Sequence, residues 1–198
     1  VMLGGGYGSS ETFAISGVAQ QNSLPFLVNT GSADKITEQN WDYVFRLNQA
    51  VSEYPTGLES FLTEVVKPQT AAILFEDSAF GSGGAKSFQE TCDRLGIKVV
   101  LSEGYSKGGM DFKPLLVKVK QANPDLVYMI SYVMDAALLM TQSMELRIMP
   151  KAFIGGGAGF TLPEFAKNAG KAAEMVFRRP SGTRRSPTPA RWNTMKSS

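Results

Sequence analysis

The chain alternates short apolar runs with segments of helical period, and this alternation limits its possible folds more than any other feature. The apolar runs are continuous, as in parallel strands that helices cover on both faces. Alternating strands and helices predict an α/β fold with parallel, doubly wound sheets. We expect the strands at residues 1–3, 24–28, 43–47, 70–75, 97–101, 126–130, 152–154 and 173–177.

Helices are expected between these strands, at the segments whose apolar residues recur every three or four positions. The residues Phe112, Leu115, Leu116 and Val119 follow this spacing. A further helix is expected from about Glu53, with Pro55 tolerated in its first turn. The other helices are expected to start near Ser10 and to span residues 83–95, 112–122 and 135–146.

The residue types exclude several kinds of chemistry. The chain has no histidine, which rules out histidine-based acid–base and nucleophile systems and most zinc sites. Its single cysteine, Cys92, lies in a helical pattern typical of core packing. No apolar run reaches the length of a membrane span. We therefore predict no catalytic residue, no metal site and no cofactor.

Charge is divided unevenly along the chain. Residues 178–198 hold six of the 20 basic residues and none of the 18 acidic ones, so the rest of the chain is acidic. We predict no nucleic-acid partner for this acidic body. The basic tail contains three prolines and many small polar residues, and we predict that it is disordered or non-native.

The first 32 residues contain the most suggestive motif. Four glycines at positions 4–8 allow a ligand to approach the backbone, and Ser9 and Ser10 follow at the start of a helix. A helix N-terminus favours a carboxylate or a phosphate. The next strand ends in residues 29–32, Asn-Thr-Gly-Ser, at the same edge of a parallel sheet. The alternative is that the serines only cap the helix and the glycines only form a turn.

Other strand ends carry weaker signals. Residues 81–87 look like a phosphate-binding loop, but Ala85 and Phe80 stand where that motif needs glycine, so a nucleotide enzyme using Lys86 is a minor alternative. Glu76 and Asp77 follow a strand without an identifiable partner acid. Aromatic residues and a second glycine-rich turn, at residues 155–159, also follow strands and predict the wall of a shared cleft.

Several motifs in order resemble the type I periplasmic solute-binding proteins of ABC transporters, in the leucine/isoleucine/valine-binding branch. The resemblance covers residues 1–177. It rests on G-Y-G-S-S-x-T at 6–12, N-T-G-S at 29–32, I-T at 36–37, Y-V-F-R at 43–46, E-D-x-x-F-G at 76–81, D-F at 111–112, N-P-D-L-V-Y at 123–128 and A-G-x-A-A-E at 169–174.

The resemblance implies a two-lobe fold that is incomplete at both ends of this chain. Residues 1–48 would form part of lobe one, residues 49–177 would form lobe two, and residues 46–49 would lie at the hinge. The chain starts without an initiator methionine or a signal peptide, so we expect an upstream part.

The resemblance also implies a ligand site. Ser9 and Ser10 would bind the ligand's carboxylate, the Thr30 carbonyl would meet an amino group, and the Ser32 hydroxyl would contact the ligand. Phe80 stands where a tyrosine is usual. The implied site residues are Ser9, Ser10, Thr30, Gly31, Ser32, Phe80, Tyr132 and Gly157, with Tyr7, Thr12 and Asp135 in secondary positions.

One position departs from the family pattern. Amino-acid binders place an acid where this chain has Gly157, and a buried ammonium without a counter-charge is unfavourable by several kcal/mol. An amine-free aromatic or aliphatic acid therefore rivals a branched-chain amino acid as the ligand. Asp135 is a candidate substitute for the acid.

The resemblance implies a non-catalytic, periplasmic or extracellular protein. It would trap a small carboxylate by hinge closure and deliver it to the membrane permease of an ABC importer. The alternative function with the same fold is a ligand-sensing domain of a receptor or regulator.

Overall fold

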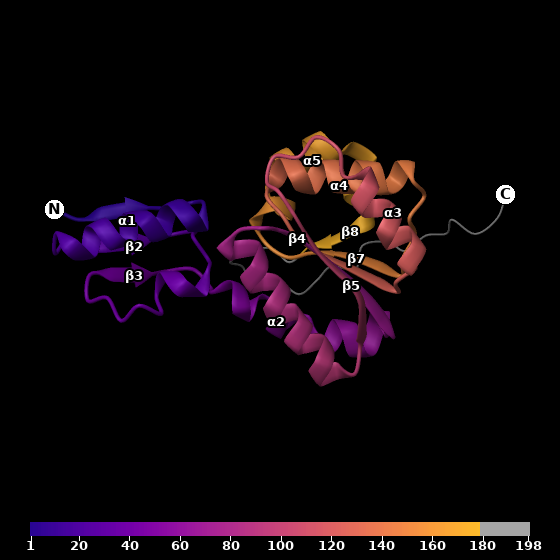
Figure 1. The fold of residues 1–198 in the computed structure, drawn as a ribbon, viewed down its shortest axis with the longest axis horizontal. Helices are drawn as coiled ribbons and strands as arrows, with labels where there is room; N and C mark the ends of the chain where they lie inside the picture. Colours follow the sequence, from indigo (N-terminus) through magenta and orange to yellow (C-terminus); the bar gives the residue numbers. More distant parts are fainter. Residues whose placement is uncertain (179–198) are drawn as a thin grey trace.

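The computed structural model describes residues 1–178, which form two parallel sheets (Figure 1). The first sheet has three strands in the order β1-β2-β3, and the second has five in the order β5-β4-β6-β7-β8. Every strand pair in both sheets is parallel. The predicted α/β class with parallel sheets is therefore confirmed.

The three-stranded sheet lies within residues 1–48, which are called lobe one below. Its elements are β1 (Leu3–Gly5), α1 (Ser9–Gln21), β2 (Phe26–Val28), a 3₁₀ turn η1 (Asp34–Ile36) and β3 (Val44–Arg46). Phe13 of α1 stacks on Trp41, with ring centroids 5.6 Å apart. The buried core of this lobe comprises Ala19, Phe26, Val28, Ala33, Ile36 and Val44.

Residues 49–178, called lobe two below, have helices on both faces of the second sheet (Figure 1). The helices of lobe two are η2 (Val51–Gly57), η3 (Phe61–Val66), α2 (Ala79–Leu95), α3 (Lys113–Ala122), α4 (Val133–Glu145), η4 (Ala158–Phe160), α5 (Pro163–Ala169) and η5 (Gly170–Met175). Its strands are β4 (Thr70–Glu76), β5 (Lys98–Tyr105), β6 (Leu126–Ile130), β7 (Ala152–Gly155) and β8 (Val176–Arg178).

Each face of the second sheet has its own core. Leu74, Val127 and Met129 pack with α3, α4 and α5 on one face. On the other face Ile73 and Tyr128 pack with α2, and the Tyr128 ring stacks on a phenylalanine of that helix at 3.8 Å. The central strand β6 is buried along its whole length. Burial on both faces explains why the lobe-two strands read as continuous apolar runs.

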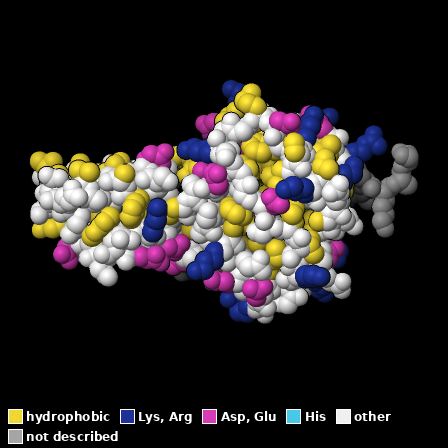
Figure 2. Space-filling view, viewed as in Figure 1, with side chains coloured by type: hydrophobic (Ala, Val, Ile, Leu, Met, Phe, Trp, Pro, Cys, Tyr) yellow, Lys and Arg dark blue, Asp and Glu magenta, His cyan; other side chains and the backbone are white. Residues whose placement is uncertain are grey.

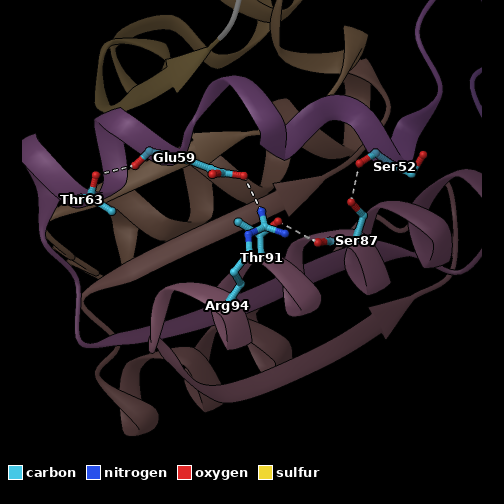
Figure 3. A network of polar contacts seen from close by, with 6 residues as sticks. All are labelled: Ser52, Glu59, Thr63, Ser87, Thr91 and Arg94. Atoms are coloured by element: carbon cyan, nitrogen blue, oxygen red, sulfur yellow. Dashed lines mark hydrogen bonds and ion pairs between the residues drawn. The ribbon is translucent and has the colours of Figure 1, made fainter.

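Polar contacts attach η2 and Glu59, which follows it, to α2 (Figure 3). The Ser87 hydroxyl donates to the Ser52 carbonyl at 2.6 Å, and the Thr91 hydroxyl donates to the Ser87 carbonyl at 3.0 Å. Further along α2, Arg94 forms an ion pair with Glu59. These contacts hold against α2 the segment that begins after β3, where the chain passes from lobe one to lobe two.

The helix expected from Glu53 is wrong in form. Pro55 has no N–H to donate, and the Leu58 N–H bonds to the Pro55 carbonyl three residues back, as in a 3₁₀ helix. The following segment widens into a π-helical turn that ends at Lys67 in the left-handed conformation. The sequence pattern therefore predicted that these residues are helical, but it did not predict the irregular 3₁₀ and π-helical geometry.

Other boundaries also differ from the prediction. α2 starts at Ala79 instead of Gly83, because the Ser78 hydroxyl accepts the Phe80 N–H and caps the helix. The strand expected at residues 173–177 begins only at Val176, after the 3₁₀ helix η5. β8 includes Arg178, and the remainder of the predicted tail lies outside the described residues. Within residues 1–178, no helix has both the length and the apolarity needed to cross a membrane.

Candidate ligand site between the lobes

Two loops of lobe one converge at the carboxyl ends of β1 and β2. The Gly31 N–H donates to the Gly6 carbonyl at 2.9 Å, and the Ala33 N–H donates to the Ser9 hydroxyl oxygen at 3.1 Å. The predicted approach of these loops is thus present. A Cβ on Gly6 or Gly31 would lie within 2.7 Å of the buried Thr12 hydroxyl oxygen, so glycine is required at both positions.

The N-terminus of α1 lies at this junction. The N-cap residue is Gly8, which has no side chain to accept the first N–H groups of the helix. Ser9 is buried, close to the Tyr132 side chain of lobe two. Ser10 is exposed. Thr12 donates its hydroxyl proton to the Gly8 carbonyl at 2.6 Å and so stabilises the glycine-rich turn before α1.

The second loop is held by protein groups. The Asn48 side-chain amide donates to the carbonyls of Thr30 and Gly31, at 3.0 and 3.4 Å. Ser32 is buried; burial raises the pKa of the Tyr54 hydroxyl, and the nearby Ser32 side chain partly opposes the shift. The Thr30 carbonyl that was expected to face a ligand amino group therefore has a donor from the protein itself.

Three aromatic rings meet where lobe one faces lobe two. The Tyr132 ring lies 5.4 Å from the Phe80 ring in lobe two and 5.8 Å from the Tyr7 ring in lobe one, between centroids. Gly157 lies beside them at φ +121°, and a Cβ there would be 2.8 Å from the Phe80 ring. The predicted ring residues and the second glycine-rich turn therefore form one cluster with the α1 N-terminus.

A lysine that the sequence reasoning missed also reaches this cluster. Lys107 Nζ lies 4.6 Å from the Tyr132 ring centroid and 3.8 Å from a carboxylate oxygen of Glu11, in the first turn of α1. The signal was present in principle, because Lys107 follows a strand end. The sequence reasoning ended that strand at residue 101, whereas β5 runs to Tyr105.

Burial perturbs several ionisable groups around the cluster. Burial raises the pKa of the Tyr132 hydroxyl to about 12, although the Ser9 N–H opposes the shift. Burial also raises the pKa values of Glu76 and Asp135, and hydrogen bonds partly oppose both shifts. The Asp135 carboxylate accepts the Gly108 N–H, with both oxygens 3.2 Å away.

Two cavities lie away from the cluster. One, of about 260 Å³, is lined by Gln49, Glu53, Thr56 and Gly57. The other, of about 350 Å³, is lined by Phe61, Val65, Val66, Lys151 and Phe177. Neither contains a predicted site residue, and contacts among the protein's own groups span the junction between the lobes.

The structure also bears on the minor alternatives. Residues 81–87 lie inside α2, so their N–H groups belong to a helix and do not form a phosphate-binding loop, and Lys86 is exposed. Across residues 1–178, no three histidine, cysteine or acidic side chains gather in a way that could hold a metal ion.

Comparisons with known proteins are consistent with this architecture. The leucine-binding protein LivK of Thermotoga maritima has a TM-score of 0.83 at 21% identity, covering 89% of this chain and 50% of LivK. LivJ of Streptococcus pneumoniae, solved with isoleucine, has a TM-score of 0.73 at 25% identity, covering 84% of this chain and 47% of LivJ. An R. palustris solute-binding protein solved with 4-hydroxybenzoate has a TM-score of 0.76 at 17% identity, with coverages of 84% and 46%.

Curated relatives show the same partial overlap. The Leu/Ile/Val-binding protein homolog 7 of Brucella melitensis is 28% identical over 174 residues, which are 84% of this chain and 44% of the relative. The chain thus spans less than half the length of this relative. A family model described as periplasmic binding protein matches residues 1–189, twelve residues beyond the expected limit at 177. The chain therefore belongs to the periplasmic binding protein family.

Proposed function

We propose that this chain is the ligand-binding part of an extracytoplasmic solute-binding protein that supplies a small carboxylic acid to an ABC importer. Family membership supports the binding role, and the curated relative is named as a binding protein. In this proposal lobe one fixes the carboxylate, lobe two closes over the rest of the ligand, and the closed form docks on the permease.

The observation that carries the proposal is the position of the α1 N-terminus against the aromatic cluster. The first N–H groups of α1 follow Gly8, which offers them no side-chain acceptor, and they carry the positive end of the helix dipole. The Tyr7, Phe80 and Tyr132 rings lie beside them. Amides beside flat apolar surfaces suit a ligand with a carboxylate at one end and a ring at the other.

The surroundings of Gly157 favour an acid without an amino group. The Phe80 ring occupies the space next to Gly157, and the positive φ there disfavours any residue with a side chain. An acidic side chain at this position would clash with that ring. Asp135, the candidate substitute, bonds to the Gly108 N–H. We therefore propose an amine-free aromatic acid ahead of a branched-chain amino acid.

The proposed hinge is the segment between β3 and η2, where the chain passes from lobe one to lobe two. Arg46 donates to the carbonyls of Ser32 and Ala33, at 3.3 and 2.9 Å, and Asn48 binds the neighbouring loop carbonyls. These bonds couple residues 46–49 to the loop at the proposed site. Motion at the hinge would therefore move the ligand loop together with the rest of lobe one.

Isothermal titration calorimetry of the full chain with benzoate, 4-hydroxybenzoate and isoleucine tests the proposal. We expect the two aromatic acids to bind and isoleucine to bind at least tenfold more weakly. Tyr7→Leu should weaken benzoate binding several-fold, because it removes a half-exposed ring of the cluster. Phe45→Leu, on an exposed ring of β3 outside the cluster, is the matched control. Binding of none of the three compounds would reject the proposal, and preferential binding of isoleucine would reject the ligand class.

A further inference from the structure

Tyr128 is a fully buried tyrosine whose hydroxyl makes no hydrogen bond within residues 1–178. Most buried polar groups in proteins have a hydrogen-bond partner, because an unpaired one costs free energy. Burial raises the pKa of this hydroxyl, so it stays protonated at neutral pH and can donate a hydrogen bond. The Tyr128 hydroxyl is therefore a donor whose acceptor does not belong to the described chain.

The Tyr128 side chain is inclined toward the carboxyl edge of the second sheet. In the strand register Tyr128 pairs with Ile154, yet a Cβ on Gly156, two residues further along, would lie 2.3 Å from the Tyr128 hydroxyl oxygen. The ring stacks on Phe88 of α2 with centroids 3.8 Å apart, and this stacking fixes its direction. The hydroxyl thus lies against the glycine-rich turn that follows β7.

The same turn borders the aromatic cluster. Gly157 is the next residue, and a Cβ there would lie 2.8 Å from the Phe80 ring and 3.7 Å from the Tyr54 ring. Phe80 and Tyr128 belong to the same buried core, and Tyr132 packs against it. Consecutive glycines therefore face the Tyr128 hydroxyl and the Phe80 ring, and neither glycine has a side chain that could separate the two.

Two other buried polar atoms lack a partner within residues 1–178, and both lie elsewhere. Asn48 Oδ1 belongs to a side chain whose amide already binds the Thr30 carbonyl of the lobe-one loop. Ser143 lies ten residues after Val133, the first residue of α4, which is about 15 Å along the helix. Of the three atoms, only the Tyr128 hydroxyl lies beside the second glycine-rich turn.

We propose that the Tyr128 hydroxyl donates a hydrogen bond to the end of the ligand opposite its carboxylate, so that the site selects aromatic acids with an oxygen acceptor there. This role of Tyr128 rests on the proposed function, which places the carboxylate at the N-terminus of α1. Ring contacts run from Tyr7, beside that terminus, through Tyr132 to Phe80, beside the turn. Polar groups at both ends of an apolar cluster match a 4-substituted benzoate.

Two acids of similar size test this selection, because the substituent of 4-hydroxybenzoate accepts a hydrogen bond and that of 4-methylbenzoate does not. In isothermal titration calorimetry the full parent chain should bind 4-hydroxybenzoate about tenfold more tightly than 4-methylbenzoate. Tyr128→Phe keeps the ring and removes the donor, so the preference should fall below about threefold.

Tyr105→Phe is the matched control for the binding experiment. It removes a hydroxyl of the same lobe that already donates to the Ser131 hydroxyl at 2.5 Å. This variant should therefore keep the preference of the parent chain for 4-hydroxybenzoate.

Thermal melts without added acid give a second readout. Tyr128→Phe loses no hydrogen bond, so its Tm should equal or exceed that of the parent chain. Tyr105→Phe loses the bond to Ser131, so its Tm should fall by about 2–4 °C. A similar fall for Tyr128→Phe would mean that the hydroxyl has a partner without the ligand, and would overturn its proposed role.

The binding results separate the role of Tyr128 from the proposed function. Binding of neither acid by the parent chain rejects the proposed function, and the role of Tyr128 with it. If the parent chain binds the acids without preference, or Tyr128→Phe keeps the full preference, only the role of Tyr128 is overturned. Loss of the preference in Tyr128→Phe but not in Tyr105→Phe supports it.

Discussion

The two lobes differ in how well their sheets are covered. In lobe two, helices cover both faces of a five-stranded sheet, and β6 is fully buried. In lobe one, α1 packs on a three-stranded sheet, while Phe45 of β3 is 53% exposed and Leu47 beyond it is 69% exposed. Figure 2 shows hydrophobic side chains on the surface of this lobe. The candidate site therefore joins a well-packed half to a thinly covered one, so stability and binding should respond differently to changes in each.

The largest effect is expected in the core of lobe two. Phe88→Ala removes a fully buried ring stacked on Tyr128 and should destabilise the chain by about 3–5 kcal/mol. Urea unfolding followed by circular dichroism measures this loss. Phe45→Ala, on the exposed surface of lobe one, should change stability by less than about 0.5 kcal/mol. Similar losses for the two variants would contradict the contrast between the lobes.

A smaller effect is expected at the loops of lobe one. Gly31→Ala would place a Cβ 2.7 Å from the hydroxyl oxygen of Thr12, a buried side chain with little rotamer freedom. We expect a loss of about 1–3 kcal/mol, measured by the same unfolding experiment. Gly4→Ala is the matched control, because a Cβ there meets no atom within 4 Å. Equal stability of the two variants would show that the loops are not tightly packed.

The smallest effect is a pH dependence in lobe two. Burial raises the pKa of Glu76 above its usual 4.5, so the folded state binds this proton more tightly than the unfolded state does. Stability contributed by the protonated form is fully present below about pH 4.5 and is lost as the pH rises through the folded-state pKa.

Glu76→Gln tests this dependence, because glutamine can still accept the Ser78 hydroxyl proton. Thermal melts of both proteins from pH 7 to pH 4 should show the parent chain gaining stability relative to the variant. A parent chain that loses stability relative to Glu76→Gln over this range would have the opposite pKa shift.

Sequence reasoning predicted which loops of lobe one meet, but not the contacts between the lobes. The meeting of the Gly6 and Gly31 loops follows from parallel topology, because neighbouring strands end at the same edge of a sheet. The contact between the Tyr132 and Tyr7 rings depends on how two separate sheets are placed, and no local pattern encodes that placement. Lys107 was missed because β5, an edge strand with a partly exposed pattern, continues beyond its apolar residues.

Proline chemistry explains another missed feature. Tyr54 lies in a 3₁₀ helix beside Pro55, and its side chain lies near that of Ser32. A regular helix, as expected from the spacing of apolar residues, would have directed this side chain differently. The sequence thus predicted the candidate loops of lobe one. It did not predict that Tyr54, which follows the passage from lobe one to lobe two, lies beside them.

The central claim is that the N–H groups at the start of α1 bind a carboxylate between the lobes. Nuclear magnetic resonance of the ¹⁵N-labelled chain during a benzoate titration tests it most directly. The account predicts that the amide resonances of Ser9 and Ser10 shift most among the residues of lobe one, and that they saturate together with binding. Saturable benzoate binding that leaves both amides unshifted, with the largest changes elsewhere, would contradict it.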